Sequence, residues 1–162
     1  MPKTAIKRIL SALFFTLACM AMLSSCDDER IYEENESIPE SGWSHDKALV
    51  FNVDIKDPAT AANFYLNVRN ADGYPYSNLF LFINTKFPNG KESNDTLECM
   101  LADDKGKWLG KGIGDIYDNQ IPFKRNVRFP LAGNYTFEIR HGMRADLIPL
   151  IMDVGLRIEK AE

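Results

Sequence analysis

The sequence predicts an all-β domain, an antiparallel β-sandwich of about seven or eight strands, which follows a signal peptide and an acidic tether. Three observations lead to this prediction. Apolar and polar residues alternate with period two in several short segments, turn signals separate these segments, and no long stretch has helical period. Short strands with closely spaced turns are typical of antiparallel sandwiches.

Residues 1–25 have the features of a secretory signal peptide. The start of the chain contains Lys3, Lys7 and Arg8 and no acid, and residues 9–23 are almost wholly apolar. A membrane-spanning helix needs roughly 20 apolar residues, so this run is short for a permanent anchor and suits an export signal that is cleaved. Its basic start also fits the rule that positive charge stays on the cytoplasmic side.

Two small residues, Ser24 and Ser25, directly precede Cys26 at the end of the apolar run. This pattern resembles the bacterial lipobox, in which the cysteine sulfur receives a diacylglycerol and the peptide before it is removed. Two or more acyl chains hold a protein stably on a membrane, whereas one chain binds only marginally. We therefore expect Cys26 to be the lipidated first residue of the mature protein. The alternative is a free or disulfide-bonded cysteine.

Removal of residues 1–25 would leave 137 of the 162 residues, enough for one domain with its own core. The signal takes three of the 19 Lys and Arg residues, so 16 remain against 23 Asp and Glu, and the net charge changes from −4 to −7. Such a chain is not expected to bind nucleic acid, because phosphate binding needs concentrated positive charge.

The number and positions of the cysteines predict a domain without disulfides. Cys19 lies in the signal and Cys26 is expected to carry lipid, which leaves Cys99 as the last thiol. Because Cys99 lies in the apolar run TLECMLA, we expect it to be a buried small hydrophobe rather than a nucleophile.

Residues 26–47 are expected to form the lipidated start and a flexible tether, since they are rich in acids and poor in aliphatic side chains. The β-sandwich is expected at 48–162. Its first two strands are predicted at 49–55 and 64–69, where apolar and polar residues alternate, with a proline-containing turn at 57–60 between them.

A central strand is predicted at residues 78–87, because both faces are apolar from Leu79 to Ile83. A helical turn or two is expected only at 141–147. The remaining strands are predicted at 96–102, 125–129 (a weaker signal), 134–140 and 151–159.

No motif in the chain predicts catalysis. The two histidines, His45 and His141, have no partner at metal-ligand spacing, and no strained nucleophile turn of GxSxG type is present. The glycine cluster at 106–115 fits neither phosphate-loop template, so its glycines are expected to let a loop cross a sheet edge closely, with Trp108 packed over the core. We therefore expect no enzyme activity, no cofactor and no metal.

Four segments resemble the gliding-motility lipoprotein family GldH of Bacteroidota, and they span nearly the whole domain in the family's order. They are residues 74–90, 95–118, 129–144 and 153–160. The resemblance implies an envelope lipoprotein that contacts other proteins of the gliding and type IX secretion machinery, with no catalytic residues to carry over. The candidate interaction residues that match the family pattern are Tyr76, Asn78, Trp108, Asp115 and Arg144.

Two further expectations concern export. The acids that follow Cys26 resemble a surface-export signal of Bacteroidota lipoproteins, which implies the outer membrane and leaves the leaflet open. The tripeptide Asp95-Thr96-Leu97 resembles an O-glycosylation acceptor of the same phylum, with Thr96 as the modified residue. The alternative is that these residues simply begin a strand.

Two functions are compatible with this pattern. The first is a non-enzymatic accessory lipoprotein that binds a protein partner through exposed aromatic residues. The second is a carbohydrate-binding sandwich, in which similar side chains would line a sugar site. A concave groove beside Trp108 and Asp115 would favour sugar binding, whereas a flat aromatic patch would favour a protein partner.

Overall fold

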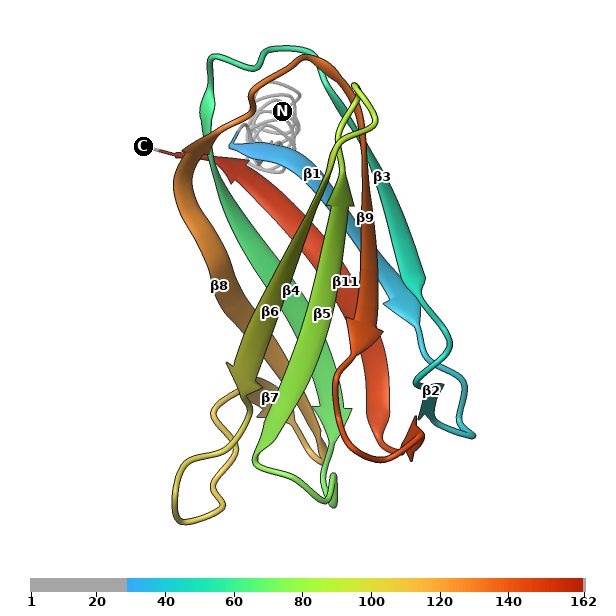
Figure 1. Ribbon diagram of the computed structural model, residues 1–162. Coiled ribbons are helices and arrows are strands. Elements are labelled where there is room, and N and C mark those ends of the chain that lie inside the picture. The colour runs from blue at the N-terminus through green and yellow to red at the C-terminus, as the bar shows by residue number, and fades with distance from the viewer. Residues whose placement is uncertain (1–28, 162) are drawn as a thin grey trace, which may run out of the picture.

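The computed structural model describes residues 29–161, and within this range it consists of strands and loops (Figure 1). None of these residues lies in a helix long and apolar enough to cross a bilayer. The strands in chain order are β1 (Arg30–Ser37), β2 (Trp43–Ser44), β3 (Leu49–Ile55), β4 (Ala61–Ala71), β5 (Asn78–Lys86), β6 (Glu92–Met100), β7 (Lys111–Ile113), β8 (Ile116–Arg128), β9 (Gly133–His141), β10 (Leu147–Ile148) and β11 (Ile151–Lys160).

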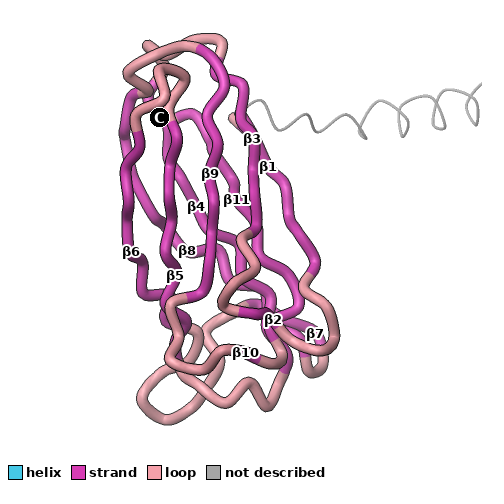
Figure 2. Tube along the Cα trace, turned by 45° about the vertical axis from the view of Figure 1, so that its right-hand side comes forward, coloured by secondary structure: helices cyan, strands magenta, loops and turns pink. Residues whose placement is uncertain are grey.

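Two antiparallel sheets pack face to face (Figures 1 and 2). One has five strands in the order β1-β11-β4-β8-β7, the other has four in the order β3-β9-β5-β6, and β10 and β2 form a separate two-stranded ribbon at one end. Along one open edge, Lys124 of β8 reaches Asp95 of β6 with an N–O distance of 2.7 Å, which ties the two sheets together. The predicted all-β antiparallel sandwich is confirmed.

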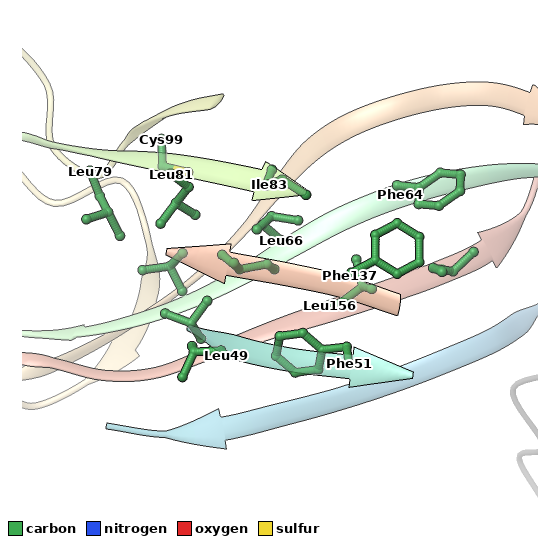
Figure 3. Close-up of a cluster of buried hydrophobic side chains, with 14 of the residues drawn as sticks. Leu49, Phe51, Phe64, Leu66, Leu79, Leu81, Ile83, Cys99, Phe137 and Leu156 are labelled. Atoms are coloured by element: carbon green, nitrogen blue, oxygen red, sulfur yellow. The ribbon is translucent and has the colours of Figure 1, made fainter. Parts of the chain in front are cut away.

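The core lies between the sheets and comes from the alternating residues of each strand. In Figure 3, Phe64 and Leu66 of the five-stranded sheet lie among Leu81, Ile83 and Phe137 of the other sheet. Full burial of such a side chain contributes about 1.5–3 kcal/mol. The period-two pattern of the sequence is therefore the main determinant of the fold.

Most predicted strands are found at their expected positions, as β3, β4, β9 and β11. The predicted central strand is β5, which lies between β9 and β6. Only one of its faces is covered, however, because Phe82 on the other face is 46% exposed. The predicted strand at 96–102 begins earlier, at Glu92, and the weak one at 125–129 is the end of the 13-residue β8.

The predicted flexible tether at residues 26–47 is wrong from residue 30 onward. Residues 30–37 form β1, which pairs with β11 along its whole length, and Trp43 of β2 is 0% exposed. The acids of this segment do not prevent folding, because Glu33 lies against Arg157, a residue far away in sequence. The first described strand therefore begins at Arg30. Cys26 and the predicted signal peptide lie outside the described residues.

The helical turn predicted at residues 141–147 is also wrong. The chain leaves β9 along the edge of β5, where the Gly142 N–H donates to the Phe80 carbonyl at 2.7 Å. Leu147 and Ile148 then pair with β2, and the Asp146 carbonyl accepts the His45 N–H at 2.7 Å. Because these backbone groups bond to other strands, they are not available for helical hydrogen bonds.

The sandwich has two ends, and β1 begins at one of them, which we call the N-terminal end. At the N-terminal end, Arg30 lies opposite Glu159, and the turns at 56–60, 87–91 and 129–132 lie nearby (Figure 1). At the other end, called the distal end below, β1, β4, β6 and β9 finish and β5, β8 and β11 begin. The distal end is formed by the loops 38–48, 72–77, 101–110, 114–115 and 142–150.

Candidate functional site

Aromatic residues from two loops, 72–77 and 101–110, and from strand β8 meet at the distal end. The buried Tyr74 ring lies 5.5 Å from the ring of Tyr76 and 6.5 Å from that of Trp108, which in turn lies 5.7 Å from Tyr117. The Trp108 indole N–H donates to the Asp72 carboxylate at 2.8 Å. Trp108 is thus half-buried against the core, as predicted.

Backbone hydrogen bonds fix these loops to one another. The Ser77 carbonyl accepts the N–H groups of Leu101 and Ala102 at 2.8 and 2.9 Å, and the Asp72 N–H donates to the Asp115 carbonyl at 2.6 Å. Bonds of this kind satisfy backbone groups that would otherwise be costly to bury. The distal loops are therefore held in a defined arrangement.

The glycine cluster permits a very tight β7–β8 turn. A Cβ on Gly112 would lie 1.9 Å from the Ile116 carbonyl oxygen, and Gly114 has a positive φ of 69° that favours glycine. This confirms the prediction that the glycines allow close backbone approach. The turn carries Ile113 at its tip, where the side chain is 96% exposed.

Exposed apolar side chains gather on the distal loops and form what we call the distal surface. The loops are neighbours: the Leu150 carbonyl accepts the Ala71 N–H at 2.9 Å, and Asp72 bonds to the turn that carries Ile113. Several exposed apolar residues on neighbouring loops are a feature of many protein-binding sites. The distal surface consists of Tyr76, Leu109, Ile113, Ile116, Leu147 and Leu150.

The candidate interaction residues all lie at the distal end, but they differ in exposure and in their contacts. Tyr76 is 39% exposed, and Asp115 is exposed in the β7–β8 turn. Arg144 is exposed in the loop from β9 to β10. Asn78 has a structural role as well, since its amide donates to Glu98 at 2.6 Å.

Thr96 lies away from the distal end, in the middle of β6, where it pairs with Phe82 and is exposed. It stays a predicted O-glycosylation position. Cys99, three residues further, is fully buried, and burial raises the pKa of its thiol to about 12. The thiol therefore stays protonated, which fits the predicted role as a small hydrophobe.

A polar groove of about 690 Å³ crosses the outer face of the five-stranded sheet. In it, Arg69 lies between two carboxylates, with Nε 2.6 Å from Asp118 and Nη1 3.1 Å from Asp153. The hydrogen bond that Arg69 donates to the Asp118 carboxylate raises the pKa of the guanidinium further above its ordinary value. The Asn67 amide bridges Glu33 and Asn35, at 3.2 Å from each.

The pKa of Glu33 is lowered. Its partial burial opposes ionisation, but hydrogen bonds from Arg30 and Arg157 outweigh that effect and stabilise the carboxylate. Sequence reasoning missed this groove because its residues come from strands far apart in the chain. The available signal was the run of polar residues at alternate positions of β4 and β8, such as Asn67, Arg69 and Asp118.

The two histidines meet near the distal end. The ring of His141 is 0% exposed and lies 5.3 Å from the His45 ring and 5.4 Å from the Trp43 ring. Burial lowers the pKa of His141, and the charge of His45 lowers it further, against smaller opposite effects of the Trp43 backbone and of Asp146. Within residues 29–161 no cluster of three or more His, Cys, Asp or Glu side chains could hold a metal ion.

This lowered pKa predicts how stability depends on pH. The unfolded chain takes up a proton near the ordinary histidine pKa of about 6.5, whereas folded His141 resists it, so the free energy of unfolding should fall as pH drops from about 7.5 to about 5.5. Urea denaturation at both pH values checks this. The fall should be smaller in His141→Leu than in His45→Gln, and equal slopes in the two variants would contradict the assignment.

The family profile and the related proteins that match this chain all carry the same description, GldH lipoprotein. The sequence profile described as GldH lipoprotein matches residues 30–158. A gliding motility lipoprotein GldH homolog of Christiangramia forsetii is 38% identical over 158 residues, which cover 93% of this chain and 96% of that protein. The gliding motility lipoprotein GldH of Flavobacterium johnsoniae is 32% identical over 162 residues, covering 96% and 99%.

Similarity to solved structures is remote. The CBM35 domain of Abf62 from Cellvibrio japonicus has a TM-score of 0.39 and 14% identity, covering 85% of this chain and 94% of that one. The CBM22-1-GH10 modules of Xyn10B from Clostridium thermocellum have a TM-score of 0.34 and 9% identity, covering 83% and 29%. Similarity at this level supports no conclusion about ligands.

Proposed function

The chain belongs to the GldH lipoprotein family, and on this basis we propose that it is a non-enzymatic, membrane-anchored module whose distal surface binds another protein of the gliding and type IX secretion machinery. A lipoprotein is lipid-anchored in the cell envelope, and we propose the outer membrane as the specific location. The observation that carries the proposal is the set of exposed apolar side chains on the loops of the distal end, which is opposite the end where β1 begins.

The proposed lipid on Cys26 would orient this surface. Only three residues lie between Cys26 and Arg30, where β1 begins, and the four peptide steps from Cys26 to Arg30 span at most about 14 Å in an extended chain. The N-terminal end of the sandwich would therefore stay close to the bilayer. The distal surface would then point away from the membrane, toward soluble parts of neighbouring envelope proteins.

The chemistry of the distal surface fits a protein partner. It combines an aromatic residue, Tyr76, with aliphatic side chains such as Leu109 and Ile113, and charged residues such as Asp115 and Arg144 lie on the same loops. Interfaces are typically built from an apolar centre and a polar rim. The hydrogen-bonded loops also reduce the ordering cost of binding.

Photo-crosslinking in intact cells tests the proposal. A photoreactive residue in place of Ile113 should capture proteins of the gliding or type IX secretion machinery, and the added substitution Leu150→Asp should reduce that capture about tenfold or more, as for loss of a central apolar contact. Val127, an exposed apolar residue at the N-terminal end, is the matched control position. Identical captured proteins from both positions, or capture of glycans alone, would contradict the proposal.

A further inference from the structure

The groove on the outer face of the five-stranded sheet borders the distal surface and shares Leu109 with it, but its polar residues lie on strands. On this face, Gly155 of β11 lies between Asn35 of β1 and Asn67 of β4. A Cβ at this position would lie 1.9 Å from the Asn35 side-chain oxygen and 2.6 Å from the Glu34 carbonyl. The glycine thus allows Asn35 to lie flat across the sheet, where it meets the amide of Asn67.

The polar groups of the groove are held in place before any ligand arrives. Arg69 is fixed by Asp118 and Asp153, and Asp153 also accepts the Ser37 hydroxyl at 2.7 Å. Planar carboxylate, amide and guanidinium groups have more donors and acceptors than these contacts use. Preorganised groups of this kind lower the entropic cost of binding a polar ligand.

The charge of the groove indicates what kind of ligand it would accept. Its lining contains three acids, Glu33, Asp118 and Asp153, and two bases, Arg69 and Lys111. Arg69 lies against Asp118 and Asp153, so neither a phosphate nor a cation would meet concentrated opposite charge. A neutral ligand with many hydroxyl groups, which both donate and accept hydrogen bonds, matches this lining better.

The groove also offers apolar groups to a ligand of this kind. The groove lining also includes Met100, Leu109 and Ile121. Sugar rings present C–H faces as well as hydroxyls, and sites for them combine a few fixed polar groups with apolar contact. The volume of about 690 Å³ is in the range of small-molecule and oligosaccharide sites.

We propose that the groove formed by Asn35, Asn67, Arg69, Asp118 and Gln120 binds a neutral oligosaccharide. The ligand would come either from the cell's own envelope glycans or from polysaccharides outside the cell. These five residues lie on strands β1, β4 and β8 rather than on the distal loops, so the inference does not depend on the protein-binding role proposed above.

Binding to the purified full-length lipoprotein in detergent tests this inference. The probes are neutral oligosaccharides released from the cells' own envelope, and a set of neutral xylo-, manno- and gluco-oligosaccharides. Isothermal calorimetry should detect binding of at least one probe, and the class that binds identifies the source. If no probe of either class binds the folded protein, the inference is overturned.

The variant Asn67→Ala places the binding in the groove, and Asn84→Ala is its matched control. The Asn84 amide bridges Glu92 and Asn94 on the opposite sheet at 3.1 and 2.9 Å, just as the Asn67 amide bridges Glu33 and Asn35. Asn67→Ala should weaken binding about tenfold, because a fixed polar contact is lost, while Asn84→Ala should leave it unchanged.

The exposed Gln120 gives a second variant with little effect on folding. Gln120→Ala should also weaken binding, and unfolding curves of each variant establish that the domain is intact. Equal affinity of wild type, Asn67→Ala and Gln120→Ala, or a loss confined to Asn84→Ala, would overturn the assignment of the groove.

Discussion

Replacing Trp43 by alanine should lower the free energy of unfolding by about 3–5 kcal/mol, the usual cost of removing a large buried aromatic side chain. Trp43 is 0% exposed, its ring packs against the buried His141, and its indole N–H donates to the Lys47 carbonyl at 2.9 Å. Few single substitutions in this domain should cost more. The result would establish that the segment before residue 48 is part of the folded core.

Urea denaturation of the purified protein measures this cost. Trp108→Ala is the matched control, since Trp108 is only half-buried at the distal end and also donates its indole N–H, to Asp72. We expect a clearly smaller loss for Trp108→Ala. A Trp43→Ala cost below about 1 kcal/mol, the level of a surface substitution, would mean that residues 30–47 behave as a tether after all.

Replacing Cys26 by serine should remove the protein from the membrane fraction, with a decrease of about tenfold or more in the membrane-bound share. Each buried CH₂ of an acyl chain contributes about 0.8 kcal/mol to membrane affinity, and serine provides no thiol to carry the chains. Fractionation followed by immunoblotting measures the distribution. Ser24→Ala, which keeps a small residue before the cysteine, should retain wild-type membrane association.

Retention of the Cys26→Ser protein at wild-type levels would show that the uncleaved apolar segment at 9–23 is the anchor. That outcome would also remove the argument for a domain held close to the bilayer. The proposed orientation of the distal surface would then need another basis.

The sequence predicts the fold well where burial follows strict alternation. The segments of β3, β4, β9 and β11 are recognisable because every second residue is apolar and enters the core. The period fails in β8, whose pairing with β4 has irregularities between Ala62 and Tyr65. Residues 116–121 pair regularly, but Asn119 is a buried polar residue and Ile116 is 37% exposed, so this part of the strand lacks the apolar alternation and reads as a polar loop.

The N-terminal strand could not be predicted for a different reason. β1 contains several acids, and composition alone favours disorder. The favourable partner of Glu33 is Arg157, which is 124 residues away, and only the folded topology brings them together. The carboxylates of this segment are thus stabilised by contacts that no local pattern reveals.

The candidate site was predictable in part. Tyr76, Trp108 and Asp115 were predicted as interaction residues, and all three lie at the distal end. The exposed aliphatic residues beside them, such as Ile113, gave no signal because single apolar residues in loops are common. The groove combines residues of β1, β4, β8 and β11, so its existence depends on sheet order, which the sequence does not specify.

Lipid attachment at Cys26 is the central claim, because the location of the domain and the direction of its distal surface both depend on it. Mass spectrometry of the intact mature protein, extracted from membranes, tests this most directly. We expect a chain that begins at Cys26 and carries covalently attached acyl groups on that residue. A mature protein that begins at another residue, or an unmodified thiol at Cys26, would contradict it.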